Sequence, residues 1–314
     1  MNRKPPPAQT GRLLARLREI AVSPHLTAAT AMLLWAFSTI VARYVRDDVP
    51  PMGLSFWRTG LAFVILLPFV VGRLRAKAEI IRRHWKILFA LGALLIVGGN
   101  AMLFLALQYT IAINAAVLNS TEPVIIIVVA WLLFRDPVGW RRVAGIALSL
   151  AGVLVLIGRG DFAVLSALDF NRGDVIVLGA YVSWAFYAVL LRRAPSELDH
   201  LTILALLLGF GTLALFPVYL VEEFAFRPTY FTWTALISIV VLAVVSSLLG
   251  LLMWNRAVIA LGPGRAGIYI HLIPAYTIVL AIILLGETLE IFHIAGIALI
   301  ATGIVLSSRK SAGH

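Results

Sequence analysis

Long apolar runs alternate with short polar connections along almost the whole chain. A helix that crosses a bilayer needs about 20 mostly apolar residues, because each residue adds about 1.5 Å toward roughly 30 Å of hydrocarbon. Ten runs meet this requirement, and they predict an all-α integral membrane protein. The predicted spans are 26–45, 52–71, 87–107, 112–134, 143–157, 175–191, 202–221, 233–257, 266–285 and 291–306.

Internal repetition divides these spans into two sets of five. The sequence AGIAL at 144–148 recurs at 295–299, a shift of 151 positions, and WAF at 35–37 recurs at 184–186. The first shift also pairs Pro123 with Pro274, Asp136 with Glu287, Gly152 with Gly303 and Ala106 with Ala257. Because five is odd, the second copy must enter the membrane the other way up. The chain is therefore predicted to hold two inverted five-helix repeats.

The repeats and their flanks give five expected regions. A cytoplasmic tail with an amphipathic surface helix comes first, because three consecutive prolines precede a basic stretch with leucines at helical intervals. No small-residue cleavage pattern follows, so we expect the first apolar run to stay as a span. The regions are the tail at 1–25, the first repeat at 26–158, a connecting loop at 159–174, the second repeat at 175–308 and a cytoplasmic tail at 309–314.

The distribution of positive charge predicts the orientation. With the N-terminus inside, twenty Lys and Arg lie in inner segments, five lie in outer ones and Arg58 lies within a span, which accounts for all 26. Short loops rich in Lys and Arg stay cytoplasmic. Matched loops also reverse their charge: the one around Asp136 holds three arginines, whereas its counterpart at 287–293 holds none. We expect a multi-pass protein of a bacterial inner (plasma) membrane with both termini in the cytoplasm.

Composition agrees with a membrane protein and excludes other classes. Hydrophobic residues make up 61% of the 314 residues and charged residues 13%, with a mean hydropathy of +0.98. Soluble domains are about half apolar and a quarter charged. The excess of basic over acidic residues, 26 to 15, is concentrated in the short connections, so no nucleic-acid partner is expected. The absence of cysteine excludes disulfides and thiolate metal sites.

Several of these features are typical of a known family. They are WAF in the first helix of each half, Arg58 in the second, and a mid-helix proline followed by an apolar run, an acidic residue and an AGIAL-like helix. Over residues 27–308 the chain resembles the ten-helix, EamA-type permeases of the drug/metabolite transporter superfamily. The sequence FRDP at 134–137 departs from the pattern, since Arg-Asp replaces the Gly-Glu that LLGE keeps at 284–287.

The resemblance implies export or exchange of small organic solutes, often amino acids, through a central cavity that opens alternately to each side. The aromatic content is similar to that of the amino-acid exporter branch. Transporters of another metabolite or drug class, a membrane receptor and a structural subunit remain alternatives. No enzyme motif, metal-ligand set or ATP-binding loop is present, so no enzyme activity, cofactor or metal is expected. The lipid bilayer and a small-molecule substrate are the expected partners, and the oligomeric state stays open.

Candidate substrate contacts should lie near helix midpoints. Tryptophan offers a stacking face, and asparagine or histidine in a dry cavity can bond an ammonium, carboxylate or amide. The alternatives are ordinary helix packing for the aromatic residues and an interhelical hydrogen bond for the asparagines. A lone histidine on an apolar helix could titrate near neutral pH or satisfy one local hydrogen bond. The candidates are Trp35, Asn100, Asn119, Trp184, Tyr187 and His271.

Two ionisable residues and two prolines complete the candidates. Arg58 and Glu122 lie inside predicted spans, where charge is costly and usually paired or functional. Three interpretations are open: a structural ion pair between them, a protonatable coupling carboxylate, and a substrate anchor. Pro123 and Pro274 occupy equivalent midpoints, where a missing backbone donor kinks a helix. Each kink could be a hinge for the movement of the halves or a static bend.

Overall fold

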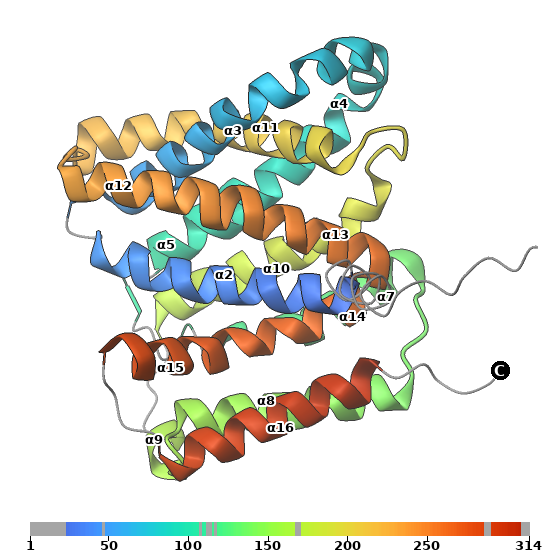
Figure 1. The fold of residues 1–314 in the computed structure, drawn as a ribbon, viewed down its shortest axis with the longest axis vertical. Helices are drawn as coiled ribbons and strands as arrows, with labels where there is room; N and C mark the ends of the chain where they lie inside the picture. Colours follow the sequence, from blue (N-terminus) through green and yellow to red (C-terminus); the bar gives the residue numbers. More distant parts are fainter. Residues whose placement is uncertain are drawn as a thin grey trace, which may run out of the picture.

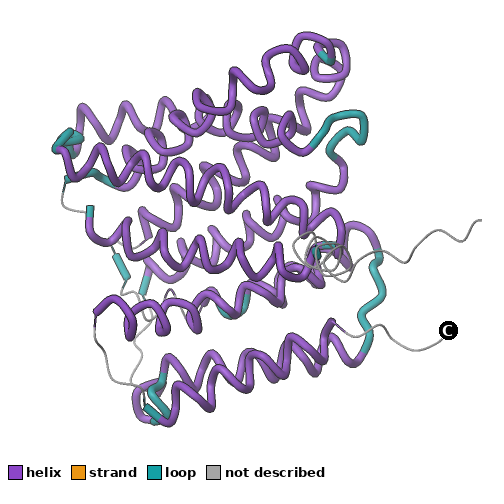
Figure 2. The backbone as a smooth tube through the Cα atoms, viewed as in Figure 1, coloured by secondary structure: helices purple, strands orange, loops and turns teal. Residues whose placement is uncertain are grey.

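The chain is helical throughout the part that the computed structural model describes, which comprises residues 23–45, 48–106, 109–110, 115, 118–166, 171–285 and 290–308 (Figure 1). No strand occurs within these residues, and short loops join the helices (Figure 2). The elements, in which η marks π-helical or 3-10 segments, are α2 (Pro24–Tyr44), α3 (Pro51–Ala76), α4 (Ala78–Ala93), η1 (Leu94–Ala101), α5 (Met102–Ala106), α7 (Glu122–Phe134), α8 (Trp140–Ile157), α9 (Phe162–Ser166), α10 (Arg172–Leu190), η2 (Leu191–Arg193), α11 (His200–Val221), η3 (Glu222–Phe226), α12 (Trp233–Leu242), η4 (Ala243–Gly250), α13 (Leu251–Leu261), α14 (Pro263–Ala266), η5 (Gly267–His271), α15 (Leu272–Leu285) and α16 (Ile291–Ser308).

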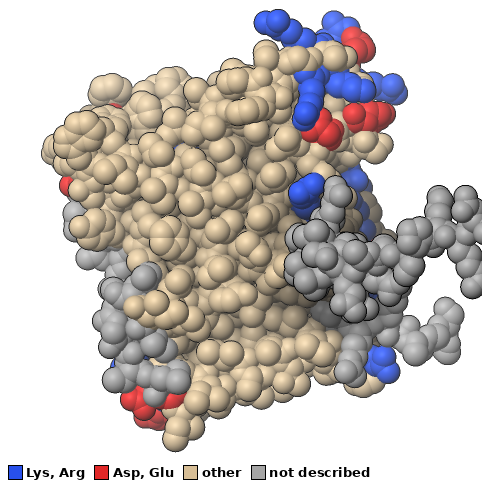
Figure 3. Space-filling view, viewed as in Figure 1, with Lys and Arg blue, Asp and Glu red and all other residues tan. Residues whose placement is uncertain are grey.

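These elements follow the ten predicted spans in order. Seven helical stretches of the described chain are long and apolar enough to cross a membrane: Pro24–Ala42, Pro51–Ala76, Ala78–Ala106, Trp140–Ile157, Arg172–Arg193, His200–Phe226 and Trp233–Leu261. Two shorter apolar helices, Glu122–Phe134 and Ile291–Ser307, and the apolar helix α15 supply the other three. The predicted all-α membrane architecture is confirmed. Charged residues gather at the edges of the face in Figure 3, most of the Lys and Arg at one edge, with a broad uncharged band between.

The third span is longer than its apolar run. It begins at Ala78 rather than at position 87 and continues without a break through α4, η1 and α5. Arg82 and Arg83 in its first turns are exposed, whereas Leu88 and Leu91 are fully buried. A helix can extend beyond the hydrocarbon in this way because its charged side chains reach water or the interface. The second repeat likewise begins at Arg172, three residues before the predicted span, where Asn171 caps α10.

The fourth span of each repeat is broken rather than continuous. In the first, residues 118 and 119 are helical, a turn follows at Ser120 and Thr121, and α7 begins at Glu122. Its counterpart consists of the short helix α14, the 3-10 segment η5 and then α15. The α-helix that contains each proline therefore begins one residue before Pro123 and two residues before Pro274.

Helices pair across the repeats rather than within them. The second helices of the two repeats, α3 and α11, pack together, and so do the fifth helices, α8 and α16. The first helix of one repeat, α2, packs against η4, α13 and α15 of the other, and α10 packs against η1, α5 and α7. In Figure 1, α2 accordingly lies between α13 and α15. The two halves of the sequence thus form one interlocked body.

The α8–α16 crossing shows the symmetry most directly. A Cβ atom on Gly145 would lie 2.6 Å from the Gly303 carbonyl oxygen, and one on Gly152 would lie 2.7 Å from the Gly296 carbonyl oxygen. These contacts are images of one another, because the 151-residue shift converts 145 into 296 and 152 into 303. Only glycine allows two helix backbones to approach so closely. Between them Ser149 Oγ donates to the carbonyl of Ile300, its own equivalent 151 residues later, at 3.3 Å.

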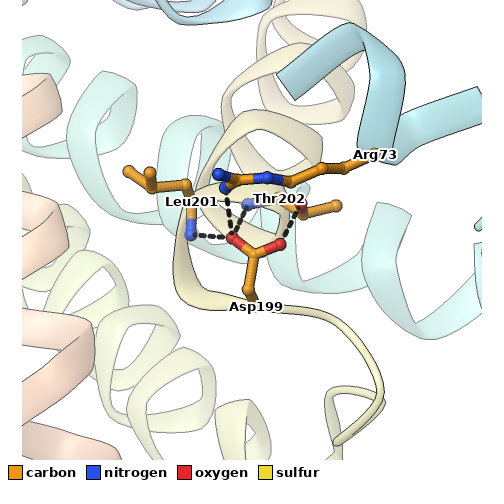
Figure 4. A network of polar contacts seen from close by, with 4 residues as sticks. All are labelled: Arg73, Asp199, Leu201 and Thr202. Atoms are coloured by element: carbon orange, nitrogen blue, oxygen red, sulfur yellow. Dashed lines mark hydrogen bonds and ion pairs between the residues drawn. The ribbon is translucent and has the colours of Figure 1, made fainter. Parts of the chain in front are cut away.

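Ion pairs connect the repeats at the edge where Lys and Arg gather. Asp199 caps α11 by accepting from the backbone N–H groups of Leu201 and Thr202, and it accepts from Arg73 of the first repeat at 3.0 Å (Figure 4). Asp136 accepts twice from Arg192, at 3.1 and 2.6 Å. This bond holds the pKa of Asp136 below its usual value. The departure from the family pattern at FRDP therefore supplies a link between the repeats.

Candidate functional site

The predicted site residues lie on elements of both repeats. Trp35 is on α2, Arg58 on α3 and Asn100 in η1, whereas Asn119, Glu122 and Pro123 lie at or just before the start of α7; Trp184 and Tyr187 are on α10, His271 ends η5 and Pro274 lies in α15. The structure brings several of them into small clusters rather than into one continuous set.

Trp35 and Trp184 occupy equivalent settings. Each indole packs on a glycine in the third span of the other repeat, Trp35 on Gly250 and Trp184 on Gly99. These glycines are themselves 151 positions apart, and each lies in a π-helical segment, η4 or η1. Such segments are rare and occur often at functional sites. Both indoles are only partly buried, so each keeps some surface beyond its glycine contact.

A cationic and aromatic cluster surrounds Ser246 in η4. Arg58 Nη1 donates to Ser246 Oγ at 3.2 Å, and the guanidinium lies 5.3 Å from the centre of the Phe104 ring. Trp35 Nε1 donates to the Ser246 carbonyl at 3.4 Å, and its ring lies 5.6 Å from that of Trp254. Arg58 of α3 and Trp35 of α2 thus meet at Ser246, with Phe104 of α5 beside the guanidinium and Trp254 of α13 beside the indole.

The ion pair predicted as one interpretation of Arg58 and Glu122 is not formed in this structure. Both side chains are buried, at 6% and 5% exposed, and both are described, yet no salt bridge joins them. Arg58 instead faces Ser246 of the second repeat. Depth along a helix places two residues at a similar height, but it does not say which side of the helix each one faces.

Glu122 belongs to a second cluster, formed by α7 and α10. It is the first residue of α7, where the partial positive charge of a helix N-terminus favours a carboxylate. Tyr181 of α10 lies close enough to interact with the Glu122 charge and with the Asn119 side chain, and its hydroxyl donates to the Ala115 carbonyl at 3.2 Å. Glu122 and Asn119 therefore both lie beside Tyr181.

His271 lies on the same symmetry axis as the α8–α16 crossing. Its Nε2 is 2.9 Å from the carbonyl oxygen of Ser120, its equivalent 151 residues earlier. A carbonyl only accepts, so Nε2 carries the proton and Nδ1 is an acceptor. Nδ1 is buried and has no hydrogen-bond partner among the described residues. His271 thus makes the local hydrogen bond that the sequence left as one alternative, and it keeps one free acceptor.

Tyr187 and Asn100, the remaining candidates, make no hydrogen bond to the residues of these clusters among those the structure describes. Tyr187 donates its hydroxyl hydrogen to Asn255 Oδ1 on α13, and both residues are buried. Asn100 is partly buried in η1, and no hydrogen bond joins it to the other predicted site residues. Sequence reasoning missed Ser246, Asn255 and Tyr181. The signal for the first two was available, since both are polar residues inside an otherwise apolar predicted span.

Each proline lies in the first turn of an α-helix rather than in the middle of a continuous one. Pro123 is the second residue of α7 and Pro274 the third of α15. In a first turn the missing N–H removes no intrahelical bond, and the ring is tolerated. The deviation from regular helix instead precedes each proline, in the turn at Ser120 and Thr121 and in the 3-10 segment η5.

Comparison with known proteins agrees with this architecture. The EamA-like transporter family matches residues 22–158 and again residues 171–309. An uncharacterized transporter of Archaeoglobus fulgidus is 30% identical over 91% of this chain and 97% of its own length. A probable terminal-alkyne amino-acid exporter of Streptantibioticus cattleyicolor is 25% identical over 90% and 92%.

Two further likenesses extend the comparison. A probable amino-acid metabolite efflux pump of Salmonella typhimurium is 23% identical over 89% of this chain and 93% of its own. A crystal structure with a TM-score of 0.72 and 19% identity covers 90% of this chain and 95% of that one, which shows the shared fold. Since the family matches both halves and its members span almost the whole chain, this multi-pass membrane protein belongs to the EamA-like transporter family.

Proposed function

We propose that this transporter exports or exchanges amino acids, including aromatic or bulky apolar ones, by alternating access around residues near the helix midpoints. The observation that carries the proposal is the matched setting of Trp35 on Gly250 and Trp184 on Gly99. Inverted repeats have two nearly equivalent packings, and exchanging them opens a central site first to one side and then to the other. Residues near the axis of that exchange stay within reach of the substrate in both states.

The substrate class is supported from two directions. Two relatives are named as a probable exporter of an amino acid and a probable efflux pump for amino-acid metabolites. The central clusters also offer partners for both ends of an amino acid, namely Arg58 with Ser246, and Glu122 with Asn119 and Tyr181. Indole faces beside them suit an apolar or aromatic side chain.

Counterflow in proteoliposomes tests the proposal. Vesicles loaded with one amino acid at high concentration should accumulate the radiolabelled form transiently, and empty liposomes should not. The panel should include phenylalanine, leucine, threonine and alanine, with a sugar and a cationic drug as comparison solutes. Accumulation of only the sugar or the drug would favour another substrate class, and no accumulation of any solute would favour a receptor or structural subunit.

Orientation is the second part of the proposal: an inner (plasma) membrane location with both termini, which lie outside the described residues, in the cytoplasm. Ser166 in α9 and Ser196 between η2 and α11 are both exposed and follow spans of opposite direction. In a chain without cysteine, Ser166→Cys should react with an impermeant thiol reagent added to intact cells, and Ser196→Cys should react only after lysis. The reverse pattern would overturn the orientation.

Glu122 is proposed as the residue that couples transport to a proton gradient. With no ion pair to Arg58, Glu122→Gln strands no cation, so we expect a folded protein that exchanges substrate but no longer responds to an imposed pH gradient. Glu79→Gln, which changes an exposed carboxylate, is the matched control. A loss of folded yield in Glu122→Gln that Arg58→Gln partly restores would instead indicate an ion pair.

A further inference from the structure

Arg58 is a buried cation that has no carboxylate partner among the residues the structure describes. It is 6% exposed and is the eighth of the 26 residues of α3, and the three salt bridges among the described residues do not include it. Arginine stays protonated in proteins, so burial does not neutralise it. A charge buried in this way is costly unless it is paired, and within a membrane protein it usually serves function.

Its existing contacts leave binding capacity unused. Nη1 donates to the Ser246 hydroxyl and the Phe104 ring lies near the guanidinium, but Nε is buried without a hydrogen-bond partner. Because Ser246 Oγ accepts from Arg58, its own hydroxyl hydrogen can donate elsewhere. An anion would therefore find a positive charge and several donors here, beside the partly buried Trp35 indole.

The second repeat holds no equivalent of this cation. The two shifts that relate the repeats, 149 and 151, carry Arg58 to Leu207 or Gly209 of α11. The helices α3 and α11 pack against each other as equivalents, yet only one of them carries a charge at this place. Shared features such as the glycine crossings belong to the scaffold. A group found on one side alone is better explained by what it binds.

We propose that Arg58, with Ser246, binds the carboxylate group of the transported solute, and that solutes carrying a carboxylate are therefore the class this protein selects. The inference rests on the proposed transport function and deepens it. Arg58 matches a carboxylate well because the guanidinium can donate two parallel N–H bonds to its oxygens. The Trp35 face next to it would contact the remainder of the solute.

Binding of matched acids and amides is the direct test. The probes are L-phenylalanine, L-leucine and L-threonine, each compared with its carboxamide, in which an uncharged NH2 group replaces one carboxylate oxygen. In purified wild-type protein at least one acid should bind more tightly than its amide. Arg58→Gln should weaken that acid by about 30-fold or more, as expected when one partner of a buried charge pair is removed, and leave the amide nearly unchanged.

Two further variants make this test specific. Arg142→Gln removes a half-buried guanidinium at the start of α8, far along the chain from Ser246, and should keep the preference for acids. Arg58→Lys keeps the charge but loses the planar fork, so its affinity should lie between those of wild type and Arg58→Gln. No preference for any acid in wild type, or an equal loss in Arg142→Gln, would overturn the proposal.

Stability supplies an independent readout. If Arg58 exists to bind an anion, Arg58→Met should melt at the same or a higher temperature than wild type without solute, because an unpaired buried charge has been replaced by an apolar chain of similar length. If the cation instead holds α3 against η4, Arg58→Met and Arg58→Gln should melt lower or fail to fold, and the proposal falls.

Failure of this inference can be told apart from failure of the proposed function. If wild type transports amino acids and Arg58→Gln transports them equally well, the carboxylate site is refuted and the transport function stands. If binding selects acids and depends on Arg58, but no amino acid shows counterflow, the amino-acid transport proposal is refuted. The anion site then stands, and its solute is another acid.

Discussion

Gly152→Leu is expected to lower the free energy of unfolding by about 3 kcal/mol and to reduce folded yield, whereas Gly72→Leu should leave both nearly unchanged. A side chain on Gly152 meets the carbonyl oxygen of Gly296, 2.7 Å from the Cβ position, and atoms of Ile300 at 2.9 Å. Backbone atoms cannot rotate away as a flexible side chain can, so α8 and α16 would have to separate. At Gly72 nothing lies within 4 Å.

The measurement is the melting temperature of the purified protein, together with the monodisperse fraction in size-exclusion chromatography. The symmetry of the repeats predicts the same effect at a second position. Gly303 is the equivalent of Gly152, and a Cβ atom added to it would also meet the backbone of the opposite helix. Gly303→Leu should therefore match Gly152→Leu. A pair of normal melting curves would mean that the crossing is looser than these distances imply.

Replacing Trp35 or Trp184 by alanine should reduce transport more than folded yield, and should affect aromatic solutes most. Each indole covers a glycine of the other repeat and keeps some surface accessible, so alanine removes an apolar face from the proposed substrate position. Stacking contributes on the order of 1 kcal/mol beyond simple burial, which corresponds to about fivefold in affinity. Initial rates per folded molecule should be compared for phenylalanine and alanine.

Trp233→Ala is the matched control, since this indole is 82% exposed at the start of α12. Its transport and its solute preference should stay at wild-type values. If Trp35→Ala and Trp184→Ala only lower the melting temperature, with transport per folded molecule unchanged, both indoles serve packing. Equal proportional losses for phenylalanine and alanine would refute stacking while leaving a more general role.

The inverted repeat and the number of spans could be predicted because they depend on patterns along the chain. The lengths of the apolar runs, the AGIAL and WAF recurrences and the positions of arginine can all be found in the sequence without knowing which residues are in contact. The structure keeps the same separation in two contacts, since His271 bonds Ser120 and Ser149 bonds Ile300, each pair 151 residues apart.

Contacts between helices could not be predicted in the same way. Rise per residue gave similar depths for Arg58 and Glu122, but Arg58 turns toward η4 and Glu122 toward α10, because helices pair across the repeats. The turn before α7 was missed although the sequence carries a signal for it, because the five residues at 119–123, Asn-Ser-Thr-Glu-Pro, interrupt the apolar run. The His271 bond to the Ser120 carbonyl lies at this break. Pro123 and Pro274 marked the region correctly, but they did not indicate that the irregular segment comes before each proline.

The interlocking of the repeats also bears on how the protein is made. The most extensive helix contacts of the first repeat are made with helices of the second, so five spans must wait in the membrane without these partners while the ribosome completes the chain. At about 5–20 residues per second this interval is on the order of ten seconds. During it Arg58 has no Ser246, and the glycine faces of α8 meet lipid. We therefore expect the protein to depend on insertion machinery that shields unpaired helices. A chain cut between the repeats should accumulate only when both pieces are made together.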